Sequence, residues 1–143
     1  MAFRYSRVVR FHETDAAGVL YFSNLLTLCH EAYEAAIASA GIDLGQFFSR
    51  TGAVAVPIVH AEVDFYQPLI CGDKLAITLV PQQLTPYSFE ISYKIQAQAT
   101  DKLAGKALTR HVCISVGDRR RHSLTAELLD WIQVINEPAT LAD

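Results

Sequence analysis

The sequence has little that would direct the protein to a membrane or to an oxidising compartment. No apolar run approaches the roughly 20 residues that a membrane-spanning helix needs. The first residues, MAFRYSRVVRFHET, alternate polar and apolar side chains and lack the apolar stretch of a secretory signal. The three cysteines have no paired spacing, so a disulfide framework is not expected. These absences predict a cytoplasmic protein without membrane insertion.

Charge and metal-binding motifs are also scarce. The 12 basic and 15 acidic residues leave a net charge of -3, and no broad basic face is present, so nucleic-acid binding is not expected. The histidine of the His30-Glu31 pair lacks the second histidine four residues on that a zinc-binding helix would use, and the other histidines are scattered. No glycine-rich loop indicates a nucleotide phosphate site. We therefore expect no metal and no cofactor.

The hydrophobic residues that are present predict a compact chain that begins with a strand and a long helix. They make up 51% of the sequence, and a single domain over residues 1–143 is expected. Alternation of apolar and polar residues predicts a first strand over residues 3–11. Apolar residues at three- and four-residue spacing then predict a helix of about five turns from roughly Tyr21 to Ala40. Ser23 or Asn24 is expected to cap it, and Gly41 to end it.

The remaining patterns predict a sheet. A short helix is expected at 44–50, strands at 53–65, 74–79, 88–99 and 104–116, and a last helix at 125–134. The strand at 88–99 has one apolar and one polar face, which is typical of antiparallel sheets. Pro57 indicates that the strand at 53–65 starts at an edge or a bulge. The fold class is α+β, with one sheet around a central helix, and pairing of sheet edges predicts a homodimer or homotetramer.

Chemistry is expected in the segment FHETDAAGVLYFSN, residues 11–24, which joins the first strand to the long helix. Asp15 is a free carboxylate that can attack an acyl carbon or activate water, and the first amides of the helix can hold an oxyanion. Gly18 lets the chain turn tightly and lets a ligand approach the backbone. The residues alone leave an alternative open, in which Asp15 only caps the helix and Gly18 is only a turn.

The run Phe11-x-Glu13-x-Asp15-x-x-Gly18-Val19-x-Tyr21-Phe22-x-Asn24 resembles the active-site signature of the 4-hydroxybenzoyl-CoA thioesterase family, which has the hotdog fold. The resemblance covers the layout of the whole chain, and a weaker match lies at 51–59. In overall character the chain is similar to the members of this group that hydrolyse 1,4-dihydroxy-2-naphthoyl-CoA in phylloquinone synthesis.

This resemblance implies hydrolysis of an aromatic acyl-CoA without a cofactor. It implies that Asp15 is the catalytic carboxylate and that the backbone amide of Phe22 is the oxyanion donor. Tyr21 and Phe22 would line the acyl site, with Gly18 beside the ligand. Related enzymes have an imidazole at the position of Phe22, so any second proton-transfer group must come from elsewhere.

Two further sets of residues are candidates for contacts with the substrate. Arg119, Arg120 and Arg121 follow the last strand and would hold the coenzyme A phosphates, although a solvated basic turn is equally compatible. His60 shares a strand face with Glu62 and Asp64, a row that would line a polar pocket, lie in solvent or form a dimer contact.

Other readings remain for the reaction itself. His111 and Cys113 share a strand face, but a buried structural cysteine is favoured over a reactive pair. The substrate alternatives are 4-hydroxybenzoyl-CoA and a broad range of acyl-CoA esters. A hydratase would need a histidine close after Asp15, which is missing. A non-catalytic acyl-CoA-binding module is the alternative outside enzymes.

Overall fold

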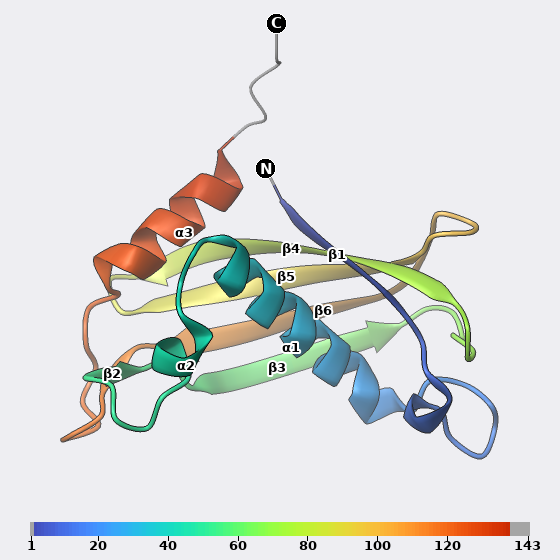
Figure 1. Cartoon of the computed structure of the whole chain (residues 1–143), viewed down its shortest axis with the longest axis horizontal. Helices are drawn as coiled ribbons and strands as arrows, with labels where there is room; N and C mark the ends of the chain where they lie inside the picture. Colours follow the sequence, from blue (N-terminus) through green and yellow to red (C-terminus); the bar gives the residue numbers. More distant parts are fainter. Residues whose placement is uncertain (1, 138–143) are drawn as a thin grey trace, which may run out of the picture.

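A five-stranded antiparallel sheet forms the body of the protein, seen here in a computed structural model that describes residues 2–137 (Figure 1). The strand order is β1-β4-β5-β6-β3, and β2 pairs with β7 in a separate two-stranded sheet. The strands are β1 Phe3–Val8, β2 Val54–Ala55, β3 Ile58–Phe65, β4 Lys74–Thr85, β5 Ser88–Ala97, β6 Lys102–Val112 and β7 Ile114–Ser115. The helices are η1 Phe11–Glu13, α1 Phe22–Ser39, α2 Leu44–Phe47 and α3 Ala126–Asn136.

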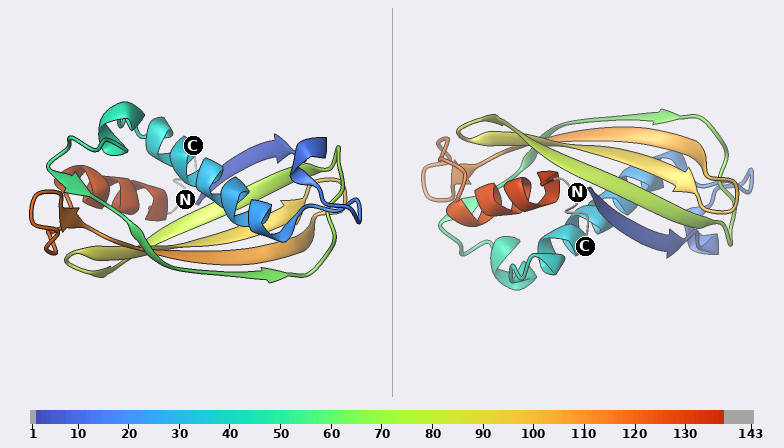
Figure 2. Two further views of the ribbon diagram at one scale, coloured as in Figure 1. Left: turned by 90° about the horizontal axis from the view of Figure 1, so that it is seen from below. Right: turned by 90° about the horizontal axis from the view of Figure 1, so that it is seen from above.

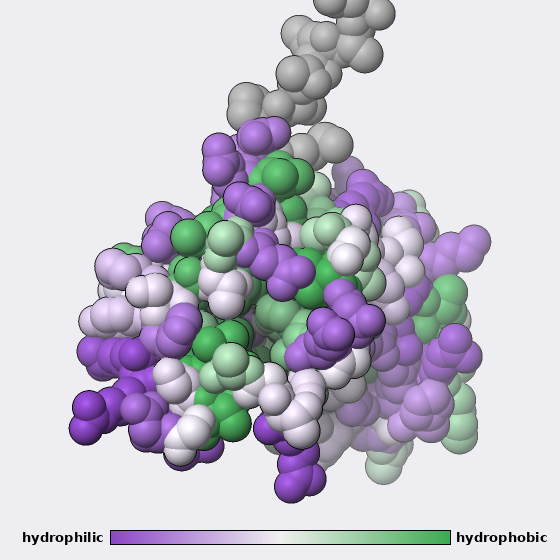
Figure 3. All heavy atoms as spheres, turned by 60° about the vertical axis from the view of Figure 1, so that its left-hand side comes forward, coloured by the Kyte–Doolittle hydropathy of each residue, from purple (hydrophilic) through white to green (hydrophobic). Residues whose placement is uncertain are grey.

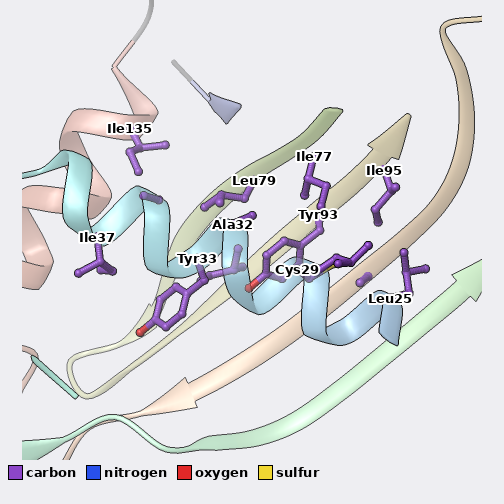
Figure 4. Packing of buried hydrophobic residues seen from close by; sticks show 14 of the residues in the cluster. Leu25, Cys29, Ala32, Tyr33, Ile37, Ile77, Leu79, Tyr93, Ile95 and Ile135 are labelled. Atoms are coloured by element: carbon purple, nitrogen blue, oxygen red, sulfur yellow. The ribbon is translucent and has the colours of Figure 1, made fainter. Parts of the chain in front are cut away.

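The long helix α1 lies across one face of this sheet, and α3 lies on the same face (Figure 2). Figure 4 shows the apolar stripe of α1 directed at the inner side chains of β4 and β5. The stripe follows from its three- and four-residue spacing, which places its apolar residues on one side of the helix. Its buried members are Leu25, Leu28, Cys29, Ala32, Tyr33, Ala36 and Ile37. The structure confirms the predicted α+β class and the hotdog arrangement.

The first strand is shorter than predicted, because it ends at Val8 and not at residue 11. Its register with β4 runs to the pair Val8 and Lys74, where β4 begins. Val9 is still buried, but the chain then turns into the single 3-10 turn η1, and the ring of Phe11 is 79% exposed. The Val9 amide still donates to the Asp73 carbonyl at 2.9 Å, so the polar and apolar alternation continues two residues past the last backbone pairing of this segment.

The strand predicted at 53–65 is divided at Pro57 into β2 and β3. Proline has no N–H to give to a ladder, which is why it stands between strands rather than inside one. The prediction of an edge or a bulge is confirmed, since β3 is the last strand of the sheet and its register with β6 shifts between Ile58 and His60. The predicted strand at 104–116 is also divided, at Cys113, into β6 and β7.

The edge strand β3 is unusual in its exposure. Every residue of β3 except the half-buried Val63 is exposed, including Ile58, Val59 and Phe65. The other edge strand, β1, instead alternates between half-buried and exposed residues. In the single chain, β3 thus leaves apolar side chains uncovered on a sheet edge that can still pair.

Candidate active site

Asp15 lies in a closed loop between η1 and α1. The loop is held by the Asp15 amide, which donates to the carbonyl of Val19 at 2.9 Å, and by the Gly18 amide, which donates to the carbonyl of Asp15 at 3.0 Å. Gly18 has a φ of 81°, a left-handed conformation that other residues rarely adopt. The Ala17 amide donates to Oδ1 of Asp15 at 2.8 Å, so one carboxylate oxygen is held and the half-exposed side chain keeps the other available.

The start of α1 carries no side-chain cap, which makes the predicted capping role of Ser23 or Asn24 wrong. The N-cap residue is Tyr21, and the side chain of Asn24 donates instead to the carbonyl of Glu13 at 2.9 Å. The amides of Tyr21 and Asn24 have acceptors. The amides of Phe22 and Ser23 have none within residues 2–137. Two donors with the partial positive charge of a helix N-terminus therefore remain open beside the Asp15 loop.

Apolar surface adjoins this loop. The exposed rings of Tyr21 and Phe22 lie in contact, with centroids 4.8 Å apart. A hollow of about 300 Å³ lies between the end of the loop, α1 and the segment after β3. It is lined by Val19, Leu20, Leu25, Phe65, Tyr66, Gln67, Pro68, Leu69 and Ala104. The Asp15 loop thus carries a carboxylate and is followed by open amides, with apolar surface nearby, and these are the groups that an acyl transfer to water requires.

The sequence matches the thioesterase-like superfamily over residues 9–132, which is most of the chain. The chain belongs to this superfamily. The matched range contains the Asp15 loop and the start of α1. The match confirms the predicted family and the prediction that the protein is a thioester hydrolase.

Individual relatives of this thioesterase are similar over nearly their whole length. The 1,4-dihydroxy-2-naphthoyl-CoA hydrolase of Nostoc punctiforme is 45% identical over 143 residues, which cover 100% of this chain and 95% of that protein. The hydrolase of the same name from Crocosphaera subtropica is 48% identical over 130 residues, covering 90% and 94%. The crystal structure of a 1,4-dihydroxy-2-naphthoyl-CoA thioesterase from Synechocystis superposes with a TM-score of 0.91 at 36% identity, covering 96% and 100%.

The other predicted substrate contacts of the thioesterase lie away from the Asp15 loop within one chain. Arg119, Arg120 and Arg121 follow β7 at the opposite end of the sheet (Figure 1). Arg121 donates to the hydroxyl of Tyr87 at 3.1 Å and lies over its ring. Arg119 lines a second hollow of about 450 Å³ together with Arg50. In Figure 3, where this end of the molecule comes forward, apolar side chains are interspersed with hydrophilic ones.

His60 lies near the beginning of β3, whereas the Asp15 loop meets the chain beyond the end of β3, at Leu69. Its side chain is on the outer face of the sheet with Glu62 and Asp64, because the helix-facing positions alternate with these. His60 Nε2 lies 3.9 Å from a carboxylate oxygen of Glu62. One chain therefore does not bring His60 and Asp15 together.

His111 and Cys113 do not form a reactive pair. The Nε2 atom of His111 is hydrogen-bonded to the hydroxyl of Thr109 at 2.8 Å. Burial raises the pKa of the Cys113 thiol, and it raises the pKa of the Cys29 thiol to about 12. Neither thiol is thus activated as a nucleophile, as the favoured reading of Cys113 predicted.

Sequence reasoning did not single out the groups that hold the loop. The buried carboxylate of Glu13 accepts from Nη1 of Arg7 at 2.6 and 2.7 Å and from the Arg10 amide at 2.8 Å. The sequence signature contains Glu13, but it does not indicate which residue Glu13 binds.

Among residues 2–137 no cluster of side chains suits a metal ion. No helix in this range is long and apolar enough to cross a membrane.

Proposed function

We propose that this thioesterase hydrolyses 1,4-dihydroxy-2-naphthoyl-CoA to the free acid and coenzyme A, as a single-domain cytoplasmic enzyme of phylloquinone biosynthesis. The observation that carries the proposal is the pair of open amides at Phe22 and Ser23 beside the Asp15 loop. The choice of substrate rests on two relatives named 1,4-dihydroxy-2-naphthoyl-CoA hydrolase, which are 45% and 48% identical to this chain.

In this proposal the carbonyl oxygen of the thioester accepts from the Phe22 amide, which stabilises the negative charge that develops on it. Asp15 acts through the carboxylate oxygen that Ala17 does not hold. It either takes a proton from the attacking water or attacks the carbonyl carbon to form a mixed anhydride that water then cleaves. In both routes the C–S bond breaks, coenzyme A leaves as the thiolate and takes up a proton, and the oxygen of one water ends in the acid.

The aryl group is proposed to lie against the exposed rings of Tyr21 and Phe22, which offer flat apolar surface at the entrance of the loop. Gly18 has no side chain and is exposed, so the ligand can approach the backbone there. The naphthoyl ring presents more apolar area than a benzoyl ring does, and this favours the larger substrate over 4-hydroxybenzoyl-CoA.

The decisive experiment compares the wild type with Asp15→Asn in a thiol-release assay on a panel of coenzyme A esters. The panel holds 1,4-dihydroxy-2-naphthoyl-CoA, 4-hydroxybenzoyl-CoA and one alkyl ester. We expect the naphthoyl ester to have the highest kcat/KM and Asp15→Asn to lower kcat by about 100-fold or more. An unchanged circular dichroism spectrum controls for folding. Near-normal turnover in Asp15→Asn would contradict the assignment, and binding without thiol release by the wild type would favour a non-catalytic module.

A homodimer or homotetramer is part of the proposal. We place the interface at β3, whose apolar side chains are exposed in the single chain. Because β3 is at the edge of the sheet, the β3 strand of a second chain can pair with it in antiparallel order. Such pairing reverses the partner chain, so the partner's arginine turn at 119–121 would approach the Asp15 end of the first chain. The substrate phosphates would then be held by the partner's arginines, with His60 near the interface.

A further inference from the structure

Glu13 is a buried charge at the base of the Asp15 loop. Glu13 is only 6% exposed, and the side chain of Arg7, which binds its carboxylate, is also largely buried. Burial on its own would raise the pKa of the Glu13 carboxyl, but hydrogen bonds from Arg7 and from the Arg10 amide outweigh it, so the pKa lies below its ordinary value. The side chain is therefore ionised at neutral pH and anchored to β1.

The backbone carbonyl of the same residue is anchored to the other side of the loop. It accepts from the amide of Tyr21 at 2.9 Å and from Nδ2 of Asn24 at 2.9 Å. Glu13, the last residue of η1, thus links this turn to two other elements, since its carboxylate is bound to β1 and its carbonyl to the start of α1. The Thr14–Leu20 bridge continues this closure toward the tip of the loop.

The two reacting groups lie directly beside these anchors. Asp15 is two residues after Glu13, and the open amide of Phe22 follows Tyr21. A shift of Glu13 would therefore move the carboxylate relative to the amide donors. Misplacement of about 1 Å at a reacting group can cost about 100-fold in rate.

We propose that Arg7, Glu13 and Asn24 are positioning residues, which set the separation between the Asp15 carboxylate and the Phe22 amide. The catalytic part of this inference rests on the function proposed above. None of the three side chains needs to touch the substrate, because each acts through the loop and the first turn of α1.

Glu31 provides a matched control within the same cluster. Its carboxylate lies 3.0 Å from Nε of Arg7 and 3.3 Å from the hydroxyl of Tyr5, and within residues 2–137 no hydrogen bond or ion pair joins it to the loop. Glu31→Gln removes a carboxylate charge from the same arginine and leaves both anchors of Glu13 in place. A general loss of charge balance around Arg7 would affect both variants, whereas a positioning role affects only Glu13.

The test compares Glu13→Gln, Asn24→Ala and Glu31→Gln with the wild type by steady-state kinetics and by amide hydrogen exchange. We expect kcat to fall by about 10- to 100-fold in Glu13→Gln, with KM changed less than about 3-fold, because geometry at the reacting centre acts mainly on the transition state. Asn24→Ala should change in the same direction. Exchange at the amides of Asp15 and Tyr21 should rise at least about 10-fold in Glu13→Gln and stay at the wild-type level in Glu31→Gln.

Three outcomes would overturn the inference: a kcat of Glu13→Gln within about 3-fold of the wild type, an equal loss in Glu31→Gln, or unchanged exchange in the loop. Failure of the proposed function is separately visible, because the wild type would then release no thiol from any ester. The kinetic part of the inference would then fall as well, and the exchange measurement would decide on its own whether Glu13 holds the loop.

Discussion

His111 makes the stability of this protein sensitive to mild acid. Its imidazole is fully buried, stacked on the ring of Phe89 at 4.6 Å and hydrogen-bonded through Nε2 to Thr109, while Nδ1 has no partner within residues 2–137. Burial, reinforced by the charge of nearby His30, lowers the pKa of His111 from 6.5 to about 4. Protonation would place a positive charge in an apolar interior, so the folded state resists it.

The size of the effect follows from the two pKa values. The unfolded chain binds the proton near pH 6.5 and the folded chain only near pH 4, so the unfolded state holds more protons between these values. The free energy of unfolding therefore decreases as the pH falls through this window, by about 3 kcal/mol in total. Well above pH 6.5 His111 is neutral in both states, and its contribution to the free energy of unfolding is then constant.

The assay is urea denaturation at pH 7.5, 6.0, 5.0 and 4.5, followed by the fluorescence of the buried Trp131, at one protein concentration because subunit association affects apparent stability. His111→Gln is the matched variant, since glutamine keeps a hydrogen-bonding group and does not titrate. It should be less stable than the wild type at pH 7.5 but lose about 2–3 kcal/mol less on acidification to pH 4.5. Equal losses in both proteins would refute the reasoning.

Three further predictions concern packing, substrate binding and assembly. Gly105→Ala should lower the free energy of unfolding, measured by urea titration, by about 1–3 kcal/mol. The new Cβ would lie 3.0 Å from the Asp64 carbonyl oxygen and 3.1 Å from a side-chain carbon of Leu25. Unchanged stability would show that the backbone of β6 can shift to accommodate the methyl group. Replacing Arg119, Arg120 and Arg121 by alanine should raise KM for coenzyme A esters and flatten its salt dependence, and an unaltered salt profile would remove them from the phosphate site. Light scattering after gel filtration should give at least twice the chain mass at micromolar concentration, and a monomer alone would exclude association through β3.

Much of the fold was predictable because its patterns are local. The alternation at 88–99 identified β5 and its inner face, and the spacing of Leu25, Leu28 and Cys29 identified α1 and the side that it buries. The errors occur where distant groups decide. Phe11 continues the strand pattern, yet the register with β4 ends at Val8, the last backbone bonds join Val9 to Asp73 and Gly72, and the chain then turns into η1.

The candidate site was predictable in part for the same reason. Asp15 and Gly18 are visible in the signature, since a carboxylate and a glycine before a helix have a chemical meaning of their own. The side chain of Asn24 would by local rules cap α1, but the carbonyl of Glu13, 11 residues earlier, is its acceptor. The role of Glu13 depends on Arg7 in another element, and no spacing rule links a strand residue to a loop carboxylate. Contacts of this kind, between residues of different elements, become visible only in the folded structure.

The uncapped start of α1 also has a consequence for how this protein can be improved. An engineer who seeks heat resistance would place serine or aspartate at Tyr21, because a cap contributes about 1 kcal/mol to a helix. That side chain would accept from the Ser23 amide, one of the two open donors, and it would remove the Tyr21 ring against which the aryl group is proposed to lie. A substitution at Tyr21 that raises the free energy of unfolding is therefore expected to lower turnover, so stability and activity are opposed at this residue.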